Sequence, residues 1–180
     1  MPIPPGTHVF GPSNATLAVR TGRTGAVAKA GHDLLLLVTD WRATFEVAGD
    51  ARPVALSLDA DGGSLRVREG TGGMQALDDD DRASIEQTID EEVLRRQQIA
   101  FRSSSIRALD DGRLAADGEL TLAGSKCPLT VELALHGDGA VNGSAVIRQS
   151  EWGIKPYSTL FGALKVADDV RVEFEGRLPA

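Results

Sequence analysis

The chain has 180 residues, of which 42% are hydrophobic and 25% charged, the balance of an ordinary soluble globular protein. This length predicts one domain over residues 1–180, and the single cysteine, Cys127, excludes an internal disulfide and agrees with a reducing compartment. The net charge of −7 argues against nucleic acid as a general partner, because phosphate binding requires a basic face. No membrane span is expected, because the longest aliphatic run covers only residues 34–38. The N-terminal residues do not resemble a signal peptide, so we expect a cytoplasmic protein.

Most of the chain alternates apolar and polar residues with a period of two, as strands do when one face is buried. In chain order, such runs cover residues 17–19, 41–47, 54–58, 65–67, 114–122, 129–135 and 170–174, and a further strand begins near Ile99. Turns rich in glycine and aspartate separate the runs at residues 49–50, 61–63, 110–112 and 137–139. We therefore predict a mostly β fold, an antiparallel meander of about eight strands. Closure into a barrel would remove its two exposed edges.

Residues 79–96 break this pattern and predict one inserted α-helix. Ile85, Ile89 and Val93 recur every four residues and would form an apolar stripe. Acidic residues crowd the start of the segment and Arg95-Arg96 stands at its end, which matches the helix dipole at both termini. Two placements are left open: across one opening of the barrel as a plug or lid, or on the outer wall.

The sequence predicts no catalytic residue, metal site or cofactor. The three histidines, His8, His32 and His136, lack a metal-binding spacing, and neither a GxSxG nor a GxGxxG motif is present. Cys127 precedes Pro128 in what we expect to be a turn between strands, where a packed thiol is the simplest interpretation.

A polar group of residues lies just before the aliphatic run 34–38. His32 stands beside Asp33, which suggests an acid–base pair, although neighbouring strand residues point to opposite faces. Arg20, Arg23, Lys29 and His32 are candidates to bind an anionic head group. The alternative is a polar cluster at the barrel mouth without a ligand.

The segment 150–161 lacks strand alternation and contains Trp152, Tyr157 and Phe161. Aromatic side chains of this kind suit the rim of an apolar pocket. Plain packing where the strands diverge explains them equally well, and both interpretations are left open.

Four segments, in order, are similar to the YceI-like family of lipocalin-like, polyisoprenoid-binding proteins. They are residues 99–106 (IAFRSSSI), 117–124 (DGELTLAG) with 128–131 (PLTV), 147–154 (IRQSEWGI) and 169–174 (DVRVEF). The resemblance implies a single elongated, antiparallel, lipocalin-like barrel of eight strands whose tunnel holds a long isoprenoid or lipid chain, without catalysis.

We therefore expect a non-catalytic binding or carrier protein for a long apolar ligand: an isoprenoid, a quinone or a lipid. The expected ligand contacts are Phe45, Leu56, Phe101, Leu120, Leu133, Ile147, Trp152, Tyr157, Phe161 and Phe174. Two alternatives remain: a small-molecule enzyme that uses His32, and a filled barrel that acts through its surface in assembly or stress response. Apolar alternation alone does not separate a hollow barrel from a filled one, and self-association into a homodimer is left open.

Overall fold

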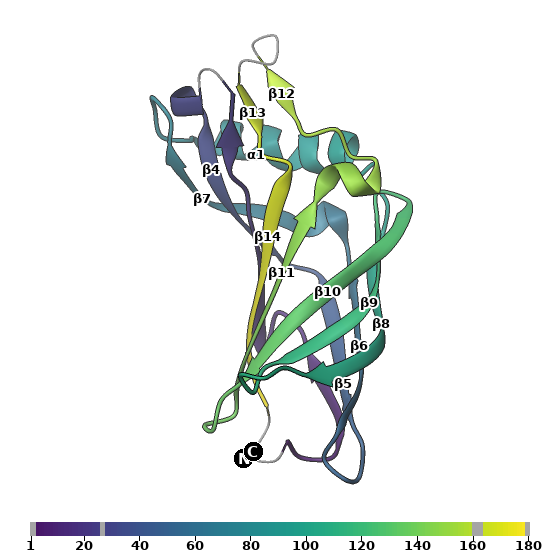
Figure 1. The fold of residues 1–180 in the computed structure, drawn as a ribbon. Helices are drawn as coiled ribbons and strands as arrows, with labels where there is room; N and C mark the ends of the chain where they lie inside the picture. The colour runs from purple at the N-terminus through teal and green to yellow at the C-terminus, as the bar shows by residue number, and fades with distance from the viewer. Residues whose placement is uncertain (1–2, 26–27, 160–163, 179–180) are drawn as a thin grey trace.

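The computed structural model describes residues 3–25, 28–159 and 164–178, and it confirms a mostly β fold (Figure 1). The large antiparallel sheet contains β1 (Gly6–Phe10), β2 (Ala15–Arg20), β4 (His32–Val38), β5 (Trp41–Val47), β6 (Pro53–Ala60), β7 (Leu65–Gly72), β8 (Ile99–Ala108), β9 (Leu114–Leu122), β10 (Ser125–Leu135), β11 (Ala140–Arg148) and β14 (Asp169–Arg177). A small sheet contains β3 (Arg23–Thr24), β12 (Ser158–Thr159) and β13 (Leu164–Val166). The helical segments are η1 (Ala28–Ala30), η2 (Gly62–Ser64), α1 (Asp79–Thr88), η3 (Ile89–Val93) and η4 (Gln149–Trp152).

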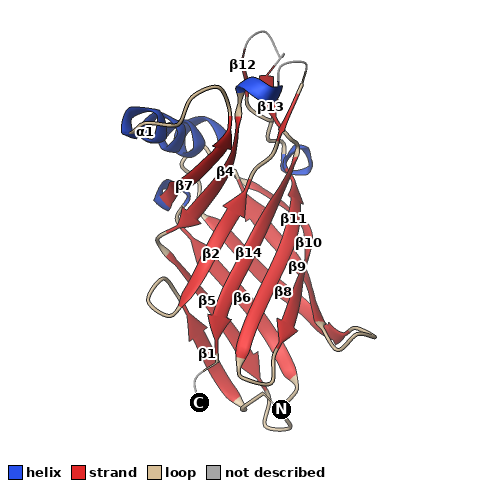
Figure 2. Ribbon diagram, turned by 90° about the vertical axis from the view of Figure 1, so that its left-hand side faces the viewer, coloured by secondary structure: helices blue, strands red, loops and turns tan. Residues whose placement is uncertain are grey.

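The large sheet curls strongly, and short connections between its distant strands explain why. Its strand order is β1-β5-β6-β8-β9-β10-β11-β14-β2-β4-β7. Only residues 11–14 join edge strand β1 to β2, which is ninth in that order. Residues 39–40 likewise join β5, the second strand, to β4, the tenth. Such short connections require the two ends of the sheet to approach each other, as Figure 2 shows.

The large sheet has eleven strands where the sequence predicts about eight, because three long strands are each broken in two. The pairs β1/β2, β4/β5 and β6/β7 follow one another across short breaks. Both halves of the first pair keep the same neighbour, since Phe10 pairs with Ala43 and Ala18 with Leu37. The first break contains Pro12, which has no N–H to donate, and the third is the short helix η2. Counted as bent strands, the eleven segments reduce to eight.

The predicted helix forms, but it ends earlier than residue 96. Asp78 and Asp81 make a capping box at its start, and ten α-helical residues are followed by the five π-helical residues of η3. Arg95 and Arg96 lie beyond the helix with φ of 56° and 55°, a left-handed conformation that turns the chain toward β8. The two arginines therefore reverse the chain rather than extend the helix.

Two side chains of α1 protect the free edge of β7. Arg82 Nη1 donates to the carbonyl of Val67 at 3.0 Å, and Glu86 Oε1 accepts from the Val67 N–H at 2.9 Å. An edge strand otherwise exposes unpaired backbone groups that can template aggregation. These contacts hold the helix against the sheet.

The sequence predicted that Cys127 and Pro128 lie in a turn between strands, and this prediction was wrong. Both residues lie inside β10. Residues 125–131 of β10 pair with β9 alone, whereas residues 132–135 pair with β11 as well. Proline is tolerated there, since no strand needs its missing N–H on the open side. The helix η4 packs against β10, where Cys127 Sγ lies 3.2 Å from the Glu151 carbonyl oxygen.

Candidate ligand-binding cavity

The curled sheet encloses a cavity of about 390 Å³. Its lining extends from Val141, near the start of β11, to Val166 in the small sheet, and includes residues from nearly every strand of the large sheet. The alternation of β5 is typical: Ala43 and Phe45 line the cavity, whereas Arg42 and Glu46 are exposed on the outer face. Among the described residues, no charged side chain lines the cavity. This space suits an apolar guest.

Aromatic rings pack at one part of the cavity wall. Phe10 and Phe174 both line the cavity and meet edge to face, with ring centroids 5.2 Å apart. Trp41 packs on Phe174 at 6.0 Å, and its buried Nε1 has no hydrogen-bond partner among the described residues. The fluorescence of Trp41 would therefore report on changes close to the cavity.

The helix covers one end of the cavity. Ile85, Ile89 and Val93, the apolar stripe expected from the sequence, all line it. Figures 1 and 2 place α1 near the small sheet, at the end of the molecule away from the N- and C-termini. Of the two placements left open, the structure therefore shows the one across an opening.

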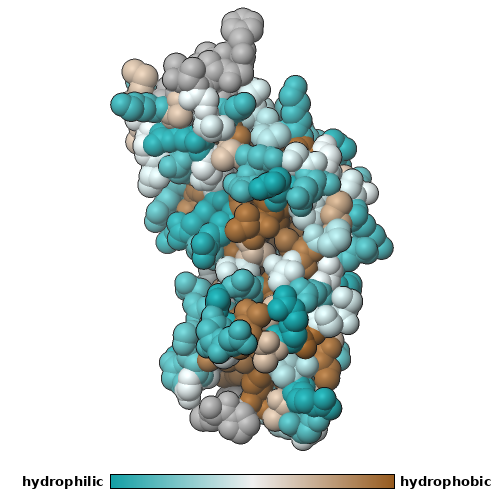
Figure 3. Space-filling view, in the orientation of Figure 1, coloured by the Kyte–Doolittle hydropathy of each residue, from teal (hydrophilic) through white to brown (hydrophobic). Residues whose placement is uncertain are grey.

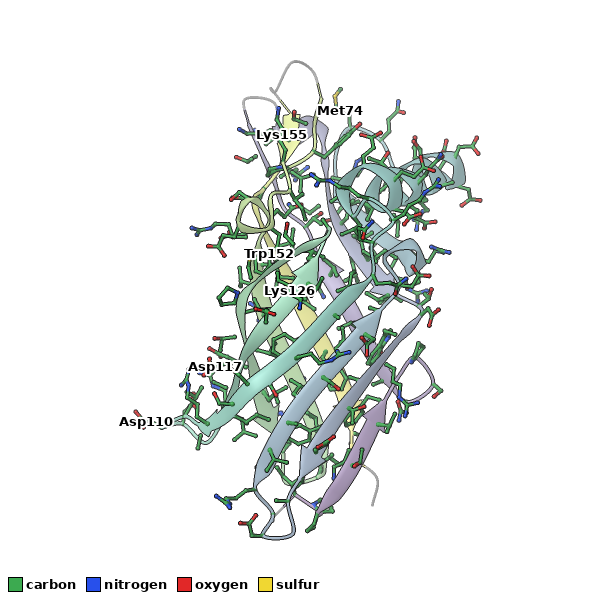
Figure 4. The ribbon with its side chains drawn as sticks, turned by 90° about the vertical axis from the view of Figure 1, so that its right-hand side faces the viewer. Met74, Asp110, Asp117, Lys126, Trp152 and Lys155 are labelled. Atoms are coloured by element: carbon green, nitrogen blue, oxygen red, sulfur yellow. The ribbon has the colours of Figure 1, made fainter. Side chains whose placement is uncertain are left out.

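Eight of the ten residues expected to contact a ligand line the cavity: Phe45, Leu56, Phe101, Leu120, Leu133, Ile147, Tyr157 and Phe174. Trp152 does not. It is 1% exposed, and its Nε1 donates to the Leu120 carbonyl at 2.9 Å, so it packs in the core behind the wall (Figure 4). Phe161 lies outside the described residues.

Several lining residues were missing from the sequence-based set. The helical segment α1–η3 contributes five, and Leu36, Val170 and Val172 contribute from β4 and β14. The alternation of Val170, Val172 and Phe174 in the sequence contained the signal for β14. The uninterrupted run 34–38 contained none for β4, because a run without alternation does not say which residues point inward.

A second, polar pocket adjoins the cavity, and both are lined by Thr21 and Leu34. It is lined by three of the four residues expected to bind a head group, Arg20, Arg23 and Lys29, together with Asp33 and Glu69.

The two arginines of this pocket already have carboxylate partners. Arg20 Nε lies 2.8 Å from Glu173, whose hydrogen bond and charge raise the pKa of Arg20. Arg23 Nε lies 3.4 Å from Asp33 Oδ1, and Arg23 also donates to the Gly31 carbonyl. Lys29 is exposed.

His32 lies apart from both pockets. Its Nε2 is 2.7 Å from the Gln75 carbonyl oxygen, while Asp33 faces Arg23. The two residues therefore do not form the acid–base pair considered from the sequence. Across the described ranges, no cluster of three or more His, Cys, Asp or Glu residues is placed to hold a metal ion.

The outer surface is mixed. On the face shown in Figure 3, apolar residues form a strip along the middle between polar flanks. One contributor to the apolar surface of the molecule is Val146 of β11, which is 57% exposed.

Residues 37–178 match the YceI-like domain. The chain belongs to the YceI-like family. A search of curated proteins finds no match.

Solved structures share the fold of this YceI-like protein. The crystal structure of BcnA from Burkholderia cenocepacia is similar with a TM-score of 0.62 at 15% identity, covering 89% of this chain and 94% of that one. The YceI protein of Campylobacter jejuni gives a TM-score of 0.52 at 14% identity, covering 81% and 85%. A mutant of that protein, crystallised with a monobromobimane guest, also gives 0.52, at 15% identity. At these identities the likeness concerns the fold alone.

Of the helices that the structure describes, none has the length and hydrophobicity needed to cross a bilayer.

Proposed function

We propose that this YceI-like protein is a non-catalytic carrier that holds one long apolar molecule, an isoprenoid, a quinone or a lipid, inside a closed eight-stranded barrel. The uncharged cavity of about 390 Å³ is the observation that carries the proposal. This volume lies within the range of roughly 300–1,000 Å³ typical of ligand pockets. The strand register supports closure, because β14 pairs with β2 and β2 continues into β1.

The energetics of an empty cavity favour a ligand over a filled barrel. Empty apolar space costs about 24 cal/mol per Å³ in lost packing. A cavity of about 390 Å³ therefore leaves much of this packing energy unrealised unless a guest fills it. Larger side chains at the small lining positions Ala43, Ala60 and Ala145 would remove part of that cost. The small residues at these positions leave room for a ligand that fills the space.

The polar pocket suggests where a head group would lie. It adjoins the cavity, so a chain in the cavity could place its polar end against Lys29. Arg20 and Arg23 form ion pairs with Glu173 and Asp33, so Lys29 is the residue of this set without a carboxylate partner among the described residues. His32 contacts neither space, and no observation favours the enzyme hypothesis based on it.

The direct test offers ligands to delipidated, refolded protein in solution, with Trp41 fluorescence and native mass spectrometry as readouts. We expect uptake of one molecule of polyprenol or isoprenoid quinone per chain. The Lys29→Ser variant should weaken the binding of a polyprenyl phosphate but not of the uncharged polyprenol, and equal losses for both would refute the head-group assignment. Failure to take up any of these molecules would refute the carrier proposal.

The cytoplasmic location and the homodimer stay predictions. Cell fractionation and analytical ultracentrifugation would test them.

A further inference from the structure

The lysines of this chain are unevenly placed. Only four lysines occur in the sequence, and three of them, Lys29, Lys155 and Lys165, lie in or next to the small sheet. Lys165 is in β13, Lys29 is in η1, which contacts β13, and Lys155 lies three residues before β12. All three are exposed. We call this group the lysine cap.

The lysine cap differs from most of the arginines and from the fourth lysine in its partners. Within the described part of the chain, no ion pair joins its three lysines to an acid, whereas eleven different arginines form such pairs. The fourth lysine, Lys126 in β10, lies 3.7 Å from Glu119 on the flank of the sheet. Figure 4 shows Lys155 at the tip of the molecule and Lys126 well below it. The lysines without a carboxylate partner are thus gathered at one end of a protein with a net charge of −7.

The small sheet also closes one end of the cavity. Val166 lines the cavity, so its neighbour Lys165 points to the opposite, outer face of β13. Tyr157 lines the cavity and is 43% exposed, which places the interior and the surface in contact there. Met74, 85% exposed, lies at the same tip (Figure 4). Positive charge, exposed apolar side chains and access to the cavity therefore coincide.

The acidic residues of this end do not cover the lysine cap. Asp33 pairs with Arg23, and of the three cap lysines only Lys29 shares the polar pocket with Asp33 and Glu69. Asp168 accepts hydrogen bonds from Ser150. The acidic start of α1 lies on the side of the molecule, below the tip formed by β12 and β13 (Figures 1 and 2).

We propose that the lysine cap docks this protein, small sheet first, on the surface of a bilayer that contains anionic phospholipid. Each lysine near such a surface strengthens binding about fivefold, and exposed apolar side chains add to the attraction. Acids more than about 10 Å away are largely screened at ordinary ionic strength. A bilayer fits better than an acidic protein, because Met74 and Tyr157 would enter its interface and the cavity would open toward its hydrocarbon. This inference goes beyond ligand storage and gives the carrier a place to load and unload.

Vesicle flotation tests the docking without any added ligand. We expect the protein to bind vesicles of phosphatidylcholine and phosphatidylglycerol but not of phosphatidylcholine alone, and to dissociate at high salt. The variant with both Lys155→Gln and Lys165→Gln should bind about 25-fold more weakly, the product of two fivefold effects. The control Lys126→Gln removes one lysine charge from the flank of the sheet and should bind like the unmodified protein. Melting temperatures of all variants would show that these exposed changes leave the fold intact.

Several results would overturn the docking proposal. The first two are the absence of binding to anionic vesicles and equal binding to neutral vesicles. The third is an equal loss of vesicle affinity in the Lys126 control and in the double variant. The fourth is self-association of the protein that depends on Lys155 and Lys165. The last result would indicate that the acidic helix of a second copy occupies the cap. Ligand uptake in vesicle-free solution is measured separately, so the failure of one proposal is distinguishable from the failure of the other.

Discussion

Filling the cavity with a larger side chain should change stability and binding in opposite directions. Ala43 lines the cavity in β5 and is only 5% exposed. The Ala43→Leu change adds three carbon atoms that point into the empty space. If the cavity is an unfilled binding site, these atoms stabilise the ligand-free protein and remove room from the ligand.

The structure sets the size of both effects. Each buried methylene contributes about 0.8 kcal/mol, so three contribute at most about 2.4 kcal/mol to the free energy of unfolding. For a chain of this size, that corresponds to a rise in Tm of roughly 5–10 °C. The same three carbons displace about as much of an apolar ligand, which lowers its affinity roughly 50-fold.

Thermal unfolding and titration with a polyprenol measure the two effects on delipidated protein. Thr44→Leu is the matched control, because Thr44 is the next residue of β5, lies on the other face and does not line the cavity. It should leave the affinity unchanged. Ala60→Leu, also at a lining alanine, repeats the test if strain prevents Ala43→Leu from folding. A loss of stability in both folded variants, with affinity unchanged, would refute the reasoning and indicate a packed interior.

Three further predictions follow from individual contacts. Arg82→Met removes the hydrogen bonds from Arg82 to the Val67 and Arg68 carbonyls but keeps the one between Glu86 and the Val67 N–H. We expect a loss of about 1 kcal/mol and faster ligand release, measured by urea unfolding and stopped-flow fluorescence. Unchanged release would show that the Arg82 contacts do not gate the cavity. Trp152→Phe removes the buried bond to the Leu120 carbonyl and should cost about 1–3 kcal/mol without changing affinity, because Trp152 does not line the cavity; an affinity loss by titration would return it to the site. The side-chain hydrogen bond from Ser150 lowers the pKa of Asp168, so its stabilisation is present above the ordinary carboxyl pKa and is lost as pH falls through the lowered one. Asp168→Asn should flatten unfolding free energy against pH in that acidic range, and an unaltered slope would contradict this role.

Much of the fold could be predicted because one face of nearly every strand is buried. The alternation over 41–47 predicts Phe45 inside and Glu46 outside, as the structure shows. The strand count could not be predicted, because three of the strands are broken. The residues on the two sides of a break either still alternate or are separated by an ordinary turn signal, so nothing in the sequence marks the break as one within a single bent strand. The left-handed Arg95 and Arg96 gave no signal, since that conformation is usual for glycine and rare for arginine.

The site was predictable where it depends on alternation and unpredictable where it depends on tertiary contacts. Phe101, Leu133 and Ile147 were expected to face the cavity, and each lines it. The position of Trp152 behind the wall depends on its hydrogen bond to β9, more than thirty residues away in sequence. Composition similarly indicated a cluster of basic residues near the start of the chain, but only the structure shows that Arg20 and Arg23 already have carboxylate partners.

The central claim is that the cavity holds an apolar molecule, and native mass spectrometry of freshly purified protein, followed by organic extraction, tests it most directly. The account predicts a species heavier than the bare chain by one discrete mass, and an extract that contains an isoprenoid, a quinone or a lipid. Protein at its bare mass, from every preparation and after exposure to these compounds, would contradict the account.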